Sequence, residues 1–274
     1  MLHTSPDLMA CVVHLSAVRG LQMERSQGHR AHALFLNVIE ASDPVLAERL
    51  HADVPIKPWT IAPLAQRNTQ LRIGDGYPLR VAFLQADLYL PFARTFLEQP
   101  QRDVTLGAGV FRLHSIQTTA QSSHWAGVTA WSELIAKAVP ADYITLRFAS
   151  PTAFAQGTDK YGKKRISLFP NGEAVFGSLL RRWNAFSPRQ LDENILDAVD
   201  ILPKRYELKT EVMLMRKNEQ LGFVGDISYK ITGDETARHV VSALADAALY
   251  LGVGYKTTHG MGLVRRIQNI EQRP

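Results

Sequence analysis

Cysteine is nearly absent from the sequence: Cys11 is the single one among 274 residues. One thiol cannot form an internal disulfide, nor can it supply the several thiolates of a structural zinc site. Cys11 also lies in an apolar run over residues 9–15, where a thiol packs as a small hydrophobic group. We therefore expect a chain that folds without disulfides in a reducing cytoplasm.

Long hydrophobic runs are missing as well, so we expect no membrane span. The N-terminal stretch lacks the features of a secretory signal, because His3, Asp7 and His14 interrupt any apolar core and no basic region precedes it. A large excess of charge is also absent, since 31 basic residues face 26 acidic ones for a formal net charge of +5. So small an excess favours a polyanionic partner only where the basic residues cluster.

Hydrophobic residues make up 46% of the 274 residues, which is enough apolar surface for two domains with sizeable cores. In the first half, strand patterns cover residues 10–18, 59–64, 70–73, 79–85 and 109–116, and helical patterns cover 32–39, 43–51 and 87–97. In the second half, strands are predicted over 143–148, 206–215, 223–231 and 262–267, and helices over 174–186 and 234–250.

Both halves therefore follow roughly the order β-α-β-β-α-β, with one more helix and one more strand in the first half. This order predicts an α+β protein with two tandem ferredoxin-like domains, an architecture shared by RNA-recognition modules. A polar stretch over residues 117–125 and the following Pro140 mark the boundary. We expect an N-terminal domain over residues 1–140 and a C-terminal domain over 141–274.

The strongest local signal is a glycine-rich loop over residues 252–262, between a predicted helix and a predicted strand. It contains Gly252, Gly254, Tyr255, Lys256, Thr257, Gly260 and Gly262. Glycine permits positive φ and close backbone approach, so successive amides can form an anion-binding nest to which Lys256 adds charge. Nucleotide-binding loops follow a strand and open a helix, which is the reverse order. The alternative to a nucleic-acid contact is a helix C-cap followed by a turn.

Basic residues also concentrate in the second half. They include Lys160, Lys163, Lys164 and Arg165, the Arg181-Arg182 pair, and Lys204-Arg205. This clustering favours nucleic-acid binding, although a short charge run is often only a solvated loop. The neighbouring Tyr161, Trp183 and Tyr255 are candidates for stacking on bases, with burial in the core as the alternative.

Candidate catalytic residues lie in the first half: His29, His32 and His51, with Lys57 six residues after the last. Imidazole titrates near neutrality, so two histidines can remove the proton of a ribose 2′-hydroxyl and protonate the leaving 5′-oxygen without a metal. Lys57 would stabilise the extra charge on the phosphorane. A structural role at a helix end is the alternative for each histidine. His29 and His32 also have the spacing of metal ligands, but no third ligand is evident nearby.

Three separated stretches resemble the CRISPR-associated repeat-processing endoribonucleases of the RAMP superfamily, which cut precursor CRISPR RNA within each repeat. These stretches are residues 32–36 with 43–51, residues 148–154, and the loop over 252–262. The second stretch contains Ser150-Pro151-Thr152 and Phe154, and Phe169-Pro170 and a helix through Trp183 follow it, as in the family's C-terminal domain.

The resemblance implies a metal-independent cut with no cofactor and a product that ends in a 2′,3′-cyclic phosphate. His51 and Lys57 match the histidine and lysine of those members that use a tyrosine, a histidine and a lysine. Leu36 stands in the tyrosine's place, so another residue must supply the remaining acid or base. His32 lies about one helical turn earlier and is our candidate, with His29 behind it. Which histidine is the acid and which the base stays open.

The partner implied by the resemblance is CRISPR repeat RNA, held by the C-terminal domain while the N-terminal domain carries the histidines. Other CRISPR effector subunits are further candidate partners, and we expect a monomer or homodimer without membrane association. Two rival hypotheses stay open. One is a non-catalytic RAMP subunit that binds CRISPR RNA, and the other is a metal enzyme with histidine ligands.

Overall fold

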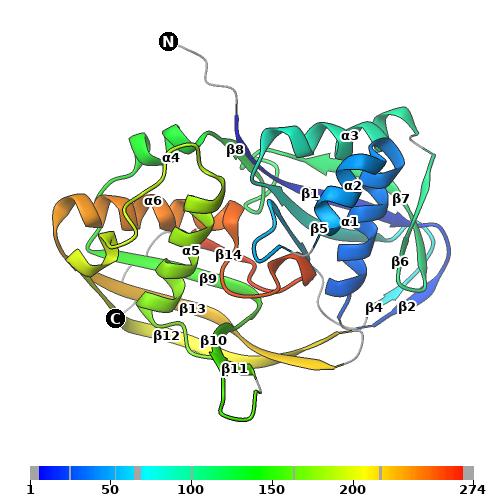
Figure 1. Cartoon of the computed structure of the whole chain (residues 1–274). Helices are drawn as coiled ribbons and strands as arrows, with labels where there is room; N and C mark the ends of the chain where they lie inside the picture. The colour runs from blue at the N-terminus through cyan, green and yellow to red at the C-terminus, as the bar shows by residue number, and fades with distance from the viewer. Residues whose placement is uncertain are drawn as a thin grey trace. The chain divides into compact units, whose positions relative to one another are not determined.

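The computed structural model describes residues 6–24, 26–52, 54–64, 69–99, 101–162, 164–215 and 218–267 (Figure 1). They form two compact units. The first comprises the chain up to Thr129 with the short segments Leu214–Glu219 and Thr258–Gly260, and the second comprises the rest. Within the described ranges, no helix combines the length and the hydrophobicity needed to cross a membrane.

The first unit is built on an antiparallel sheet in the order β3-β5-β1-β7-β6, with β8 also paired to β1. These strands are β1 (Leu8–Ala17), β3 (Trp59–Pro63), β5 (Gly76–Phe83), β6 (Asp103–Leu106), β7 (Gly109–Gln117) and β8 (Gly127–Thr129). A second small sheet pairs β2 (Leu21–Met23) with β4 (Thr69–Leu71). Alternate residues of β1, such as Cys11, Val13 and Leu15, belong to the core, as a strand with one core-facing side requires.

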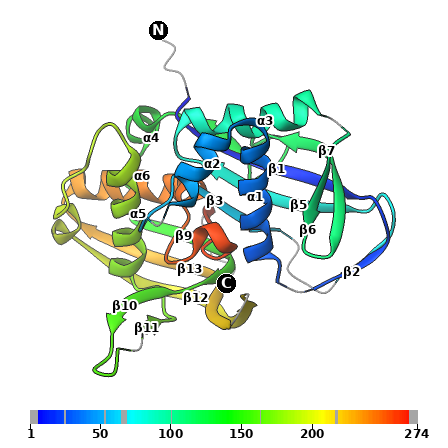
Figure 2. The same ribbon diagram turned by 45° about the vertical axis from the view of Figure 1, so that its right-hand side comes forward.

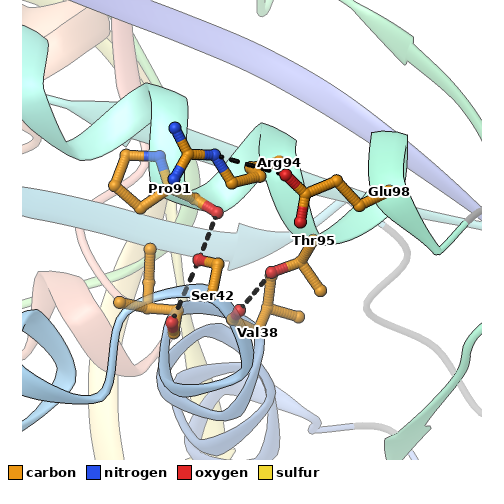
Figure 3. Close-up of polar contacts among 7 residues, drawn as sticks. Val38, Ser42, Pro91, Arg94, Thr95 and Glu98 are labelled. Carbon is orange, nitrogen blue, oxygen red and sulfur yellow. Dashed lines mark hydrogen bonds and ion pairs between the residues drawn. The ribbon is translucent and has the colours of Figure 1, made fainter.

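Three helices complete this core: α1 (Gly28–Ser42), α2 (Pro44–His51) and α3 (Tyr89–Glu98), which follows the short 3-10 helix η1 (Ala86–Leu88). Phe35 of α1 stacks on Trp59 of β3 with ring centroids 3.9 Å apart. The buried Thr95 hydroxyl donates to the Val38 carbonyl at 2.7 Å, and the Ser42 hydroxyl donates to Pro91 O at 2.7 Å (Figure 3). These bonds fix α3 against α1, the helix that carries His32.

The second unit has the sheet order β12-β13-β9-β14. Its elements are α4 (Trp131–Lys137), β9 (Tyr143–Thr152), β10 (Phe154–Thr158), β11 (Lys164–Ser167), α5 (Gly172–Phe186), η2 (Ile195–Ala198), β12 (Val199–Leu214), β13 (Glu219–Gly233), α6 (Glu235–Leu251) and β14 (Val264–Ile267). Asp234 caps α6 by accepting a hydrogen bond from Ala237 N at 2.9 Å, as the sequence predicts. The β10–β11 hairpin extends away from this unit's sheet (Figure 2).

Each unit has the same arrangement of four main strands, which are β1, β3, β5 and β7 in the first unit and β9, β12, β13 and β14 in the second. In both units the first of these strands lies between the third and the fourth, and the second pairs with the third. The predicted α+β class with tandem ferredoxin-like units is confirmed. The basic run is part of a hairpin: Lys160 lies in its turn, and Lys164 and Arg165 begin β11, which pairs with β10. These short strands are rich in polar and charged residues and lack the alternation that marks a half-buried strand.

Candidate active site

His32 is held by a backbone carbonyl. Its Nδ1 lies 2.9 Å from the oxygen of Thr258, in the segment Thr258–Gly260 that belongs to the first unit. A carbonyl oxygen only accepts hydrogen bonds, so Nδ1 must carry the proton. In the neutral ring the lone pair then resides on Nε2, which makes that nitrogen available to take a proton from a substrate hydroxyl.

Two aromatic rings fix the plane of His32. The His259 imidazole stacks on it with centroids 4.0 Å apart and planes inclined by 19°. Trp59 packs on it at 5.0 Å, and Trp59 is itself stacked on Phe35 in the core. Trp59 and Phe35 are fully buried, so the core holds one of the two rings that pack on His32.

His51 and Lys57 lie at the end of the neighbouring helix. Asp43 caps α2 by accepting from Leu46 N at 2.9 Å, and the helix ends at the exposed His51, as predicted. The Lys57 ammonium donates to Leu50 O at 2.9 Å and also to Ala52 O. Lys57 therefore folds the chain back onto the last carbonyls of α2 and places a positive charge beside His51.

The charges of Lys57 and His51 act on His32. Burial lowers the pKa of His32 below its usual value; the hydrogen bond to Thr258 opposes this shift, and Lys57 and His51 add to it. Three predicted residues are thus linked, because the charges of His51 and Lys57 act on His32. The net result is a neutral His32 near pH 7, which is the protonation state that a general base needs.

The other predictions in this region have mixed outcomes. His29 lies in the first turn of α1 and is half-buried, and its catalytic role stays a prediction. Leu36 is buried in the core, so no polar group replaces the missing tyrosine at that position. Among the residues that the structure describes, no three metal-ligating side chains gather into a site for the rival metal enzyme.

His259 is a residue that the sequence reasoning missed. The only local hint is its place between Thr258 and Gly260 in the glycine-rich loop, because its ring partner His32 lies in another part of the chain. The loop is shared between the units, since Thr258–Gly260 belongs to the first and its flanking residues belong to the second. Gly260, which the sequence predicts to contact RNA, therefore belongs to the same unit as His32 and His51.

The glycine-rich loop has the positive φ values that the sequence predicts, at Gly252, Gly254, Gly260 and Gly262. The expected nest of amides is nevertheless wrong for residues 252–255 and for Gly262, whose amides are already bonded. The amides donate within the protein: Gly252 to Ala248 O, Val253 to Gly262 O, Gly254 to Ser178 Oγ, Tyr255 to Ala153 O and Gly262 to Pro151 O. The glycines instead permit close packing, since a Cβ on Gly254 would lie 2.5 Å from Ala153 O.

This bonding pattern connects two of the sequence motifs. Residues 150–154, at the junction of β9 and β10, accept hydrogen bonds from the loop through Pro151 O and Ala153 O, and Ser150 Oγ accepts from Leu263 N at 2.9 Å. The motif that carries the resemblance in the second half is therefore the support of the glycine-rich loop.

Arg182 has a different place from the one the basic cluster suggests. Its side chain is buried, and it donates to Thr257 Oγ1 at 2.8 Å and to Gly254 O at 3.4 Å. Burial lowers its pKa to about 10, and the charge of Arg181 adds to this shift. Arg182 thus holds the loop from inside. Trp183 is buried as well, so the suggestion that it stacks on bases is wrong.

Two of the predicted RNA contacts in the loop, Tyr255 and Lys256, have partly accessible side chains. Lys256 has φ 58°, and its ammonium lies 5.1 Å from the centre of the Tyr255 ring, while burial lowers its pKa. The Tyr255 hydroxyl donates to Gln220 in β13. Of the other predicted loop contacts, Gly252, Thr257, Gly260 and Gly262 are buried. Lys256 is therefore the loop residue best suited to meet an anion.

The remaining predicted RNA contacts lie on the β10–β11 hairpin and on α5. Lys160 and Arg165 are exposed, and Lys160 lies 5.0 Å from the centre of the exposed Tyr161 ring. Lys164 begins β11, and Lys163 lies outside the described residues. Arg181 is exposed on α5. Their contact with RNA stays a prediction.

Two protein-family models match the two halves of the chain. The family model of the CRISPR Cas6 N-terminal domain matches residues 9–136, and that of the CRISPR-associated endoribonuclease Cas6 matches residues 146–264. A curated CRISPR-associated endoribonuclease Cas6 from Streptococcus thermophilus is 27% identical over 128 residues, which are 45% of this chain and 50% of that protein. The chain thus aligns with half the length of this curated relative.

Solved structures match nearly the whole chain. A Cas6 product complex from Thermus thermophilus is 28% identical with a TM-score of 0.83, covering 96% of this chain and 100% of that one. A Cas6 substrate mimic complex is 26% identical with a TM-score of 0.69, covering 96% and 100%. The fold defines a protein of two tandem ferredoxin-like domains. Within that class, the chain belongs to the Cas6 family.

Proposed function

We propose that the protein is a metal-independent endoribonuclease that cleaves precursor CRISPR RNA within its repeats. The observation that carries the proposal is the oriented His32, whose Nδ1 is occupied by a carbonyl at 2.9 Å and whose pKa is lowered by burial and by Lys57 and His51. Such a ring is a competent base at neutral pH. Membership in a family of endoribonucleases supports the same reaction.

The reaction uses the substrate's own nucleophile. His32 Nε2 takes the proton of the ribose 2′-hydroxyl, the 2′-oxygen attacks the adjacent phosphorus, and the bond from phosphorus to the 5′-oxygen breaks. His51, in its protonated form, gives a proton to that leaving oxygen. The products are a 2′,3′-cyclic phosphate and a 5′-hydroxyl, and the charge of Lys57 stabilises the phosphorane between them.

RNA binding is assigned to the accessible basic residues of the glycine-rich loop and of the β10–β11 hairpin. The related structures were obtained as product and substrate mimic complexes, which supports a substrate site in this fold. We propose CRISPR repeat RNA as the ligand here. Association with other CRISPR effector subunits, and a monomeric or dimeric state, are further parts of the proposal.

Lys256→Ala is expected to weaken binding of repeat RNA about tenfold and to reduce the slope of log K against log salt by about one, as loss of one phosphate contact does. Filter binding at several salt concentrations measures both. Lys137→Ala is the matched control, because Lys137 is also a lysine of the second unit but pairs with Glu133 on its own helix. An unchanged affinity and slope for Lys256→Ala would show that the loop is only structural.

A cleavage assay separates the proposed function from a non-catalytic RAMP subunit. The purified protein is incubated with cognate repeat RNA in excess chelator, and the products are separated on a denaturing gel. We expect one cut within each repeat. Binding without any cut would support the non-catalytic subunit, and cutting that stops in chelator and returns with one added metal would support the metal enzyme.

A further inference from the structure

Thr258 contacts two imidazoles at once. Its carbonyl accepts from His32 Nδ1 at 2.9 Å, and its hydroxyl Oγ1 lies 3.0 Å from His259 Nδ1. The two rings stack at 4.0 Å. Thr258 thus contacts the Nδ1 atom of each ring.

The segment that carries Thr258 and His259 is packed against the first residue of α1. A Cβ on Gly28 would lie 2.0 Å from His259 O, and Gly260 has φ 89°. Glycine at position 28 thus allows backbone-to-backbone contact between the start of α1 and this segment. His32 lies one turn further along α1. The segment whose Thr258 carbonyl orients His32 is therefore packed against the helix that carries His32.

A stacked histidine is poorly placed as the second catalytic group. In-line displacement needs the base and the acid on opposite sides of the phosphorus. Two rings stacked with their centroids 4.0 Å apart leave no room for a phosphate between them. The stack instead restricts rotation of His32 about its side-chain bonds, as a third group does for a catalytic base elsewhere.

We propose that Thr258 and His259 are positioning residues for His32: the Thr258 carbonyl selects the tautomer with the proton on Nδ1, and the His259 ring holds the imidazole plane. This inference rests on the proposed function of His32 as the base. It gives the glycine-rich loop a second role, since the segment that ends the predicted RNA-binding loop also prepares the catalytic ring.

The test compares His259→Phe, which keeps a flat ring for stacking, with His259→Ala, which removes it. For His259→Ala we expect the single-turnover cleavage rate to fall about tenfold or more, as misplacement of a catalytic group does, with unchanged RNA affinity. His259→Phe should stay within about threefold of the natural protein by the same argument. Equal losses in both variants, or no loss in His259→Ala, would overturn the positioning role.

A measurement without substrate keeps this inference separate from the proposed function. Nitrogen-15 NMR of the histidine side chains reports which ring nitrogen carries the proton. We expect His32 to show the Nδ1-protonated tautomer in the natural protein and in His259→Phe, and a mixture of tautomers in His259→Ala. An Nε2-protonated His32 in the natural protein would overturn the inference even if the RNA is cut. The expected pattern in a protein that cuts no RNA would leave the positioning intact and refute the catalytic proposal alone.

Discussion

His32→Asn is expected to lower the single-turnover rate of repeat cleavage by about 10²–10⁴-fold, the range seen when a general base is removed. Asparagine keeps an N–H that can donate to Thr258 O, so the local fold and the packing of α1 are retained. It lacks a group equivalent to Nε2 that can accept a proton. The rate under enzyme excess measures the chemical step, and RNA affinity should change little.

His114→Asn provides the matched control, because His114 is an exposed histidine of β7. A rate for His32→Asn close to that of the control would remove His32 from the mechanism.

The pH profile gives a second readout. Because burial, Lys57 and His51 lower the pKa of His32 from 6.5, the acidic side of the pH profile should fall to half of the full rate at a pH below 6.5. Lys57→Met removes one of these charges, so it should raise the pKa of His32 and move the acidic side of the pH profile to higher pH. His51 and the stacked His259 remain in place in this variant.

His51→Ala is expected to lower the cleavage rate by a similar factor of about 10²–10⁴, because the leaving 5′-oxygen would lose its proton donor. His51 ends α2 and is exposed, so alanine removes little packing and the fold should be unchanged. RNA affinity is measured in parallel and should stay within about twofold, as is usual when a group acts only in the transition state.

A substrate with a better leaving group distinguishes the acid from the base. Replacing the leaving 5′-oxygen by sulfur removes the need for a proton donor, so it should restore much of the rate in His51→Ala and little of it in His32→Asn. Undiminished cutting of ordinary RNA by His51→Ala would contradict the assignment. Rescue of His32→Asn instead would exchange the two roles.

The features that the sequence predicted well are local ones. Asp43 and Asp234 cap α2 and α6 as predicted, because a cap is decided by a carboxylate and the amides of the next turn. The alternating and helical patterns of the long elements likewise identified both ferredoxin-like units. The element order then fixed the strand order, since each unit follows the same connections.

The features that were missed depend on contacts between distant parts of the chain. Thr258 and His32 are 226 positions apart, so neither the carbonyl that orients His32 nor the His259 stack leaves a local pattern. Arg182 looks like its exposed neighbour Arg181 in the sequence, but the helix turns it inward to Thr257. The short strands β6 and β8 are too brief for periodicity and form only by pairing with β7 and β1.

The measurement that tests the central claim most directly is cleavage of a repeat RNA with a single 2′-deoxy nucleotide on the 5′ side of the scissile phosphate. Without that hydroxyl, the proton acceptor His32 has no nucleophile to activate. We predict that this RNA binds normally and is not cut in excess chelator, while the all-ribose RNA is cut to a 2′,3′-cyclic phosphate and a 5′-hydroxyl. Cleavage of the deoxy-substituted RNA, or a product with a 3′-hydroxyl end, would contradict the account.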